Sequence, residues 1–95
     1  MLYTIASSPF NCDFAAIVSL LTPEDEVLLI QDGVLAATNA GYYLATLQEK
    51  GVNIFALRDD VEARGLQTVL SIDVPQLTYQ QFVLLTVKHS QHFAW

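Results

Sequence analysis

The chain has 95 residues, of which 53% are hydrophobic and only 15% are charged, and its formal net charge is −6. Its four basic residues are scattered and form no positive patch, which argues against direct binding to nucleic acid. The longest uncharged stretch is too short and too polar to cross a membrane. The single cysteine excludes an internal disulfide and a cysteine-rich zinc site, so a reducing, cytoplasmic setting is the simplest expectation.

The apolar content is high for so short a chain. Residues 1–95 are expected to form one domain, and a domain of this size buries only roughly 60–65% of its unfolded surface. Some apolar side chains should therefore remain exposed, and large exposed apolar patches usually mark contacts between proteins. The composition thus predicts a subunit of a larger assembly.

Two strands and one helix are predicted in the first third of the chain. A short apolar run predicts a strand over residues 2–6, and Asn11 is a plausible N-cap for a helix whose apolar residues recur at helical spacing through Leu21. A turn containing proline separates this helix from Val27–Ile30, where four aliphatic residues follow one another without alternation. Such a run is typical of a strand that is buried on both faces of a parallel sheet.

The rest of the chain continues this alternation. Residues 33–48 have helical character with a break near residues 38–41, and a third strand is predicted over residues 52–57. Beyond it we expect a short helical turn, a short helical piece, an edge-type strand and a last helix with a capping box, over residues 60–64, 66–70, 74–77 and 78–89. The tail, residues 91–95, has no regular pattern.

Alternating strands and helices predict right-handed βαβ units. The expected fold is a small Rossmann-like α/β domain of three layers, with a mainly parallel sheet of four to five strands. The carboxyl ends of its first three strands would bring Ser8, Gln31, Asp32 and Asp60 to one edge of the sheet. In open α/β sheets, ligand and partner sites gather at that edge.

Two residues have both a chemical and a structural interpretation. Cys12, near a helix N-terminus, could carry sulfur as a reactive thiol, but it has no second cysteine or basic residue nearby, which favours a small packing role instead. Asp32 could bind a ligand at the sheet edge. The pattern Asp-Gly before an apolar helix favours a capping role instead.

The remaining candidates point to no cofactor. His89 and His92 share one helical face, but no third and fourth ligand is evident, so no metal is expected. Arg64 is expected to pair with Asp60, four residues earlier. The glycines match no phosphate-binding loop, and there is no nucleophile elbow.

An ordered set of short segments resembles the TusB/DsrH family of small sulfur-relay proteins. The matching segments are Ser8–Phe10, Leu28–Val34, Ala56–Leu57, Asp60–Gly65 with its Ala63-Arg64-Gly65, Phe82–His89 and Ala94–Trp95. They span nearly the whole chain at the length and in the order of the family. The residues that the resemblance singles out are Ser8, Pro9, Gln31, Asp32, Gly33, Arg64, Gly65, Lys88 and Trp95.

The resemblance implies a DsrE/F/H-like fold and a role without catalysis of its own. Members of this kind assemble with TusC-like and TusD-like subunits into a heterohexamer, two copies of each. The complex passes persulfide sulfur toward 2-thiolation of the wobble uridine of tRNA, and the sulfur-carrying cysteine belongs to the TusD-like subunit. DsrH-type relatives carry a cysteine well inside the first helix, where this chain has Val18, so Cys12 does not inherit that role.

Two other functions remain open at this stage. The chain could be an independent persulfide carrier that uses Cys12. It could also be a small-molecule-binding α/β domain with its site around Ser8, Asp32 and Asp59. Fold alone does not choose among these functions.

Overall fold

The computed structural model describes residues 1–39 and 41–95. Its centre is a five-stranded sheet in the order β4-β3-β2-β1-β5, in which every neighbouring pair of strands is parallel. The strands are β1 (Leu2–Ile5), β2 (Glu26–Leu29), β3 (Asn53–Leu57), β4 (Gln76–Leu77) and β5 (His92–Ala94). The helices are α1 (Phe14–Leu20), the 3-10 helix η1 (Gln31–Ala37), α2 (Tyr42–Glu49), α3 (Arg58–Ala63) and α4 (Tyr79–Lys88).

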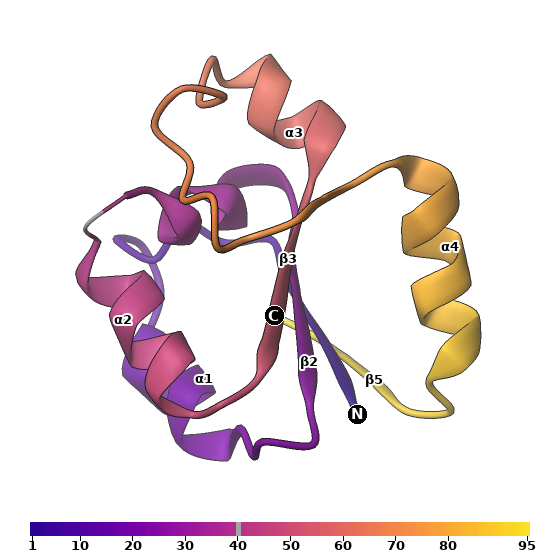
Figure 1. Ribbon diagram of the computed structural model, residues 1–95. Helices are drawn as coiled ribbons and strands as arrows, with labels where there is room; N and C mark the ends of the chain where they lie inside the picture. The colour runs from indigo at the N-terminus through magenta and orange to yellow at the C-terminus, as the bar shows by residue number, and fades with distance from the viewer. Residues whose placement is uncertain (40) are drawn as a thin grey trace.

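Helices lie on both faces of the sheet (Figure 1). α1 and α2 lie over one face, and α4 lies over the other. Because successive side chains of a strand point to opposite faces, β1 sends Tyr3 and Ile5 into the main core and Leu2 into a smaller one. In the smaller core, Leu2 and Leu28 pack with Leu85 of α4. The predicted three-layer α/β fold is confirmed.

The central strand is where the sequence places it, and the edge strand exists but is shorter than the predicted strand over residues 74–77. All four residues of β2 are buried, as the unalternating aliphatic run predicts. β4 is an edge strand beside β3, and Pro75 precedes it, since a proline cannot donate to a sheet ladder. The carbonyl of Pro75 still accepts from the Ala56 N–H at 3.0 Å.

Two predicted helix starts and one predicted helical piece are wrong. Asp13, not Asn11, caps α1, because the Asp13 carboxylate reaches the Ala16 N–H at 3.2 Å. α3 begins at Arg58, two residues earlier than predicted. Residues 66–70 form turns rather than a helical piece, and this segment ends in an antiparallel bridge between Leu70 and Thr38.

The largest difference concerns the tail, which forms strand β5 beside β1. Trp95 N–H donates to the Thr4 carbonyl at 2.7 Å, and Ala6 N–H donates to the Trp95 carbonyl at 2.9 Å. The rings of Tyr3, Phe93 and Trp95 follow one another, with centroids 5.7 and 5.6 Å apart. A three-residue strand is too short to show periodicity, so only its pairing with β1 reveals it.

The predicted helical stretch over residues 33–48 forms but begins two residues earlier, at Gln31. The helical stretch after β2 is divided between η1 and α2, and position 40 of the predicted break lies outside the described residues. Gly51 follows α2 with φ +73°, a conformation that suits glycine at a helix end. Thr78 and Gln81 form the capping box of α4. None of the described helices has the length and apolar character needed to cross a membrane.

Candidate functional site

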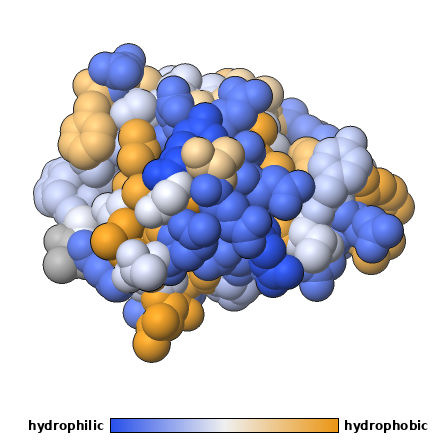
Figure 2. Space-filling model, turned by 90° about the horizontal axis from the view of Figure 1, so that it is seen from above, coloured by the Kyte–Doolittle hydropathy of each residue, from blue (hydrophilic) through white to orange (hydrophobic). Residues whose placement is uncertain are grey.

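Polar groups from two elements meet at the carboxyl edge of the sheet. The backbone N–H of Gln31 donates to Asp60 Oδ2 at 2.8 Å. Arg64 Nε donates to Asp32 Oδ1 at 3.0 Å, and Arg64 Nη1 lies 3.8 Å from Asp60 Oδ1. The predicted meeting of Gln31 and Asp32 with Asp60 and the predicted Arg64–Asp60 pair are therefore confirmed, whereas the Ser8 hydroxyl bonds within its own loop. Figure 2, which views the molecule from the side of α3, shows that the centre of this face is hydrophilic.

The capping interpretation of Asp32 is wrong. η1 begins one residue before Asp32, its first N–H, that of Gln31, donates to Asp60 of α3, and the Asp32 carboxylate pairs with Arg64 instead. η1 starts too early for Asp32 to stand in front of it, so the carboxylate is free to turn toward α3. The Asp32 side chain is 62% exposed, so the pair is a surface ion pair between η1 and the end of α3.

The backbone before η1 is constrained. Gln31 has φ +49°, a left-handed conformation that costs a residue with a side chain about 1–2 kcal/mol. Gly33 packs so close to β1 that a Cβ atom there would lie 1.9 Å from the Ile5 carbonyl oxygen. The same oxygen accepts from the Ile30 N–H at 3.0 Å. Gly33 is thus needed for the close approach of η1 to the end of β1.

Ser8, Pro9 and Gly65, which the resemblance also singles out, lie in a loop and at a helix end. Ser8 and Pro9 are buried in the loop after β1, and Ser8 Oγ accepts from the Phe10 N–H at 3.2 Å. Gly65 follows α3 with φ +64°, as a glycine that ends a helix does. Ser8 is thus engaged within its own loop.

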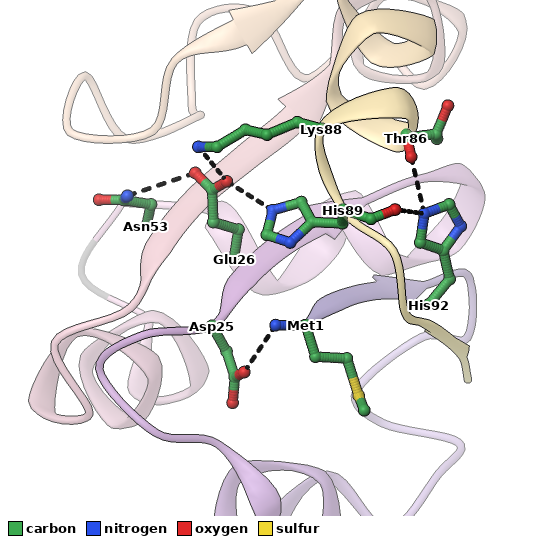
Figure 3. A network of polar contacts seen from close by, with 8 residues as sticks. All are labelled: Met1, Asp25, Glu26, Asn53, Thr86, Lys88, His89 and His92. Atoms are coloured by element: carbon green, nitrogen blue, oxygen red, sulfur yellow. Dashed lines mark hydrogen bonds and ion pairs between the residues drawn. The ribbon is translucent and has the colours of Figure 1, made fainter.

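A second polar network lies at the opposite edge of the sheet, and Figure 3 shows it from close by. Glu26, the first residue of β2, is buried. Its Oε1 atom lies 2.7 Å from both Lys88 Nζ and His89 Nε2, at the end of α4, and its Oε2 atom accepts from Asn53 Nδ2 at 3.3 Å. Because a carboxylate only accepts, His89 Nε2 carries the hydrogen of its contact. The network joins the end of α4 to the neighbouring strands β2 and β3.

The two buried acids of this edge are held ionised. Burial alone would raise the pKa of Glu26, but the hydrogen bonds from Lys88, His89 and Asn53 outweigh it and lower the pKa. Burial would likewise raise the pKa of Asp25, yet hydrogen bonds from the Thr22 N–H and the ammonium group of Met1 lower it. Sequence reasoning missed Glu26; its signal was a charged residue at the head of a strand that is otherwise wholly aliphatic.

Both histidines have partners in the protein. His89 contacts Glu26, and His92 Nε2 lies 2.8 Å from the Thr86 carbonyl and 3.0 Å from that of His89 (Figure 3). In the part of the chain that the structure describes, no three side chains of the metal-binding types are grouped for an ion. His89 and His92 are therefore structural residues, which hold the end of α4 and its connection to β5.

Cys12 lies in a groove of about 710 Å³ between α1 and α2. Val18, Tyr42 and Tyr43 also line this groove, and Asp13 stands beside the thiol in the sequence. Burial raises the pKa of the Cys12 thiol, and the negative charge of Asp13 raises it further. The reactive thiolate is thus disfavoured, which is the opposite of what a sulfur carrier needs.

The fold and the family model agree on the class of this protein. The model described as DsrH like protein matches residues 7–92, and the chain belongs to this family. The crystal structure of the YchN protein from E. coli has the same fold, with a TM-score of 0.77 at 18% identity over 99% of this chain and 97% of that one. Protein Tm0979 from Thermotoga maritima gives 0.69 at 25% identity, covering 96% and 97%.

Within this class, the chain is similar to proteins named TusB. It is 50% identical to Protein TusB of Photorhabdus laumondii subsp. laumondii over 95 residues, which is 100% of both chains. It is 46% identical to Protein TusB of Shigella sonnei over the same length. The resemblance that the sequence segments carry is therefore confirmed.

Proposed function

We propose that the chain is a non-catalytic subunit of a TusBCD-type sulfur-relay complex in the cytoplasm. In this role it holds a sulfur-carrying partner in position while persulfide sulfur passes toward 2-thiolation of the wobble uridine of tRNA. Identity of 46–50% to TusB proteins over the full chain supports the relay. The setting of Cys12 carries the non-catalytic part of the proposal, because the only thiol of the chain has a raised pKa.

The surface supports a role in assembly. Large apolar side chains are exposed in several places, as the composition predicts. They include Phe10, Tyr42, Ile72, Tyr79, Leu84 and Val87, each more than 60% exposed. Side chains of this kind lose their contact with water when subunits associate, so they favour a chain that works with partners over one that works alone.

The carboxyl edge is the proposed position of partner contact within the family motif. Gln31, Asp32 and Arg64 are exposed or half-buried there, and the backbone of Gln31 itself is strained. Strained backbone persists where the surrounding structure enforces it, and it is common at functional positions. Ser8, Gly33 and Gly65 keep structural roles in this proposal, because they shape the loops around that edge.

The persulfide carrier is the weaker alternative. A carrier would need a thiolate at neutral pH, whereas burial and Asp13 raise the pKa of Cys12. A small-molecule site around Ser8, Asp32 and Asp59 is also disfavoured, because Ser8 is buried and bonded within its own loop, and Asp32 pairs with Arg64.

Affinity purification followed by native mass spectrometry tests the proposal. The tagged chain would be expressed with TusC and TusD in an E. coli strain that lacks its own TusB. We expect both companions to co-purify in a complex with two copies of each subunit. Recovery of the chain without either companion, at normal abundance, would contradict the proposal.

A further inference from the structure

The turn that joins β2 to η1 has a backbone conformation that its sequence does not favour. The Gly33 N–H donates to the Ile30 carbonyl at 2.9 Å, which closes a four-residue turn with Gln31 as its second residue. Gln31 has φ +49°. Turns with a positive φ at this place are dominated by glycine, asparagine and aspartate, because the left-handed conformation is costly for other residues. A glutamine therefore needs an interaction that holds it there.

A carboxylate from a later helix supplies this interaction. The Gln31 N–H donates to Asp60 Oδ2 at 2.8 Å, across 29 positions of the sequence. A hydrogen bond to an ionised carboxylate is roughly twice as strong as one between neutral groups. The gain from such a bond and the strain of one left-handed residue are of similar size, so this bond can decide which conformation the turn adopts.

Asp60 is itself held in position for this bond. Its other oxygen, Oδ1, lies 3.8 Å from Arg64 Nη1, and the same nitrogen donates to the Asp60 carbonyl at 3.2 Å. Arg64 Nε also donates to Asp32 Oδ1, at 3.0 Å. Residues at and just after α3 thus contact both central residues of the turn, and Figure 1 shows α3 and the turn at the same end of the sheet.

The turn can change its conformation without disturbing the sheet. Both of its ends are fixed on β1, since the Ile30 N–H donates to the Ile5 carbonyl at 3.0 Å and Gly33 packs against the same oxygen. Only Gln31 and Asp32 lie between these fixed points, and both are exposed. Loss of the Asp60 bond would therefore change the direction of these two side chains while the core stays as it is.

We propose that Asp60 is a positioning residue, which holds the turn in its left-handed conformation so that Gln31 and Asp32 are presented to a companion subunit in a fixed direction. A contact surface that is ordered before binding loses less conformational freedom on association. The part of the inference that concerns assembly rests on the proposed function. The part that concerns the conformation of the turn can be tested on this chain alone.

NMR spectroscopy of the purified full chain tests the conformation. The NOE between the amide and α protons of Gln31 should be strong in the wild type, because these protons are closest at positive φ. Asp60→Ala should lose this strong NOE, whereas Asp60→Asn should keep it, since its side-chain carbonyl oxygen still accepts. Glu62→Ala is the matched control, because it removes an exposed carboxylate of the same helix, and it should keep the NOE. An unchanged NOE in Asp60→Ala overturns the proposal.

Hydrogen exchange of the wild type keeps the proposal falsifiable if Asp60→Ala fails to fold. Gln31 is exposed, so its amide proton depends on the bond to Asp60 for protection. Its exchange should be roughly tenfold or more slower than in an unfolded chain. Exchange at the unfolded rate overturns the proposal.

The affinity for TusC and TusD tests the role in assembly. Asp60→Ala should weaken binding about tenfold, because two contact side chains must then be ordered on association. Asp60→Asn and Glu62→Ala should bind as the wild type does. Wild-type affinity in Asp60→Ala, or an equal loss in Asp60→Asn, overturns the positioning role. Failure of the wild type to bind contradicts the proposed function as well, whereas the NMR result decides the conformation of the turn in either case.

Discussion

The His89 Nε2 atom lies 2.7 Å from Glu26 Oε1, although 63 positions separate the two residues in the sequence. This contact joins the end of α4 to the first residue of β2, in the middle of the sheet (Figure 3). Both side chains are largely buried, whereas Lys88, the second partner of the same oxygen, is 64% exposed. We therefore expect Glu26 and His89 to contribute more to stability than Lys88.

Glu26→Gln should lower the free energy of unfolding by about 2–3 kcal/mol at neutral pH, since it removes the charge of a buried carboxylate that accepts hydrogen bonds from Lys88, His89 and Asn53. The exposed Asp32→Asn change is the matched control and should cost less than about 1 kcal/mol. Urea denaturation measures both values. Equal losses for the two variants would contradict the importance of the buried network.

The same network gives a dependence on pH. The pKa of Glu26 is lowered in the folded chain, so its contribution is complete above the unfolded glutamate pKa of about 4.3 and is lost as the pH falls through the lower folded pKa. Between pH 6 and pH 3 the wild type should therefore lose more stability than Glu26→Gln does. Parallel curves of unfolding free energy against pH would show that Glu26 is not the group responsible.

Gly33→Ala should destabilise the fold by about 3 kcal/mol or more, because its Cβ would lie 1.9 Å from the Ile5 carbonyl oxygen and force the backbone apart. Gly65→Ala is the control, because it adds backbone strain without a steric clash. Gly65 also has a left-handed conformation, with φ +64°, but no heavy atom lies within 4 Å of a Cβ there, so its cost should be about 1 kcal/mol. Thermal denaturation should rank the two variants in this order, and the reverse order would refute the close packing of η1 on β1.

Gln31→Gly should stabilise the chain by about 0.5–1 kcal/mol, because glycine adopts φ +49° without strain and only part of that gain is lost to backbone entropy. Gln80→Gly, at an exposed position of α4, has the opposite expectation and should cost about 0.5–1 kcal/mol. Chemical denaturation compares them. A loss of stability at position 31 similar to that at position 80 would show that Gln31 is unstrained.

The sequence alone predicts the layers of this fold well, because they depend on strong local patterns. The aliphatic run Val27–Ile30 marks the central strand, and the spacing of Phe14, Ile17 and Leu21 marks the buried side of α1. Thr78 and Gln81 mark the start of α4, since their capping box needs only residues three positions apart.

The errors arise where tertiary contacts decide the structure. β5 exists because the tail pairs with β1, which begins ninety positions earlier, at Leu2. Asp32 satisfies the local rule for a cap, yet Arg64 of a later helix takes its carboxylate. Glu26 gains its partners from β3 and the end of α4, so no local window of sequence contains the network.

The isolated chain should not bind tRNA. Affinity for a phosphate backbone comes mainly from clustered basic side chains, and here Arg64 and Lys88 are already paired with carboxylates of their own chain. Fluorescence anisotropy with labelled tRNA at low salt is the most sensitive trial, because low salt strengthens any electrostatic contact. Saturable, salt-sensitive binding at low micromolar concentration would place the chain elsewhere in the pathway.

The 2-thiouridine content of tRNA tests the central claim most directly. An E. coli strain without its own TusB would carry either this chain or its Cys12→Ser variant, and nucleoside mass spectrometry would measure the thiolated fraction. Both versions should restore thiolation to a similar level, because in the proposed role the chain serves the relay without carrying sulfur on its own thiol. Failure of the wild-type chain to restore thiolation would contradict the relay role. Failure of Cys12→Ser alone, at normal protein abundance, would show that Cys12 carries the sulfur.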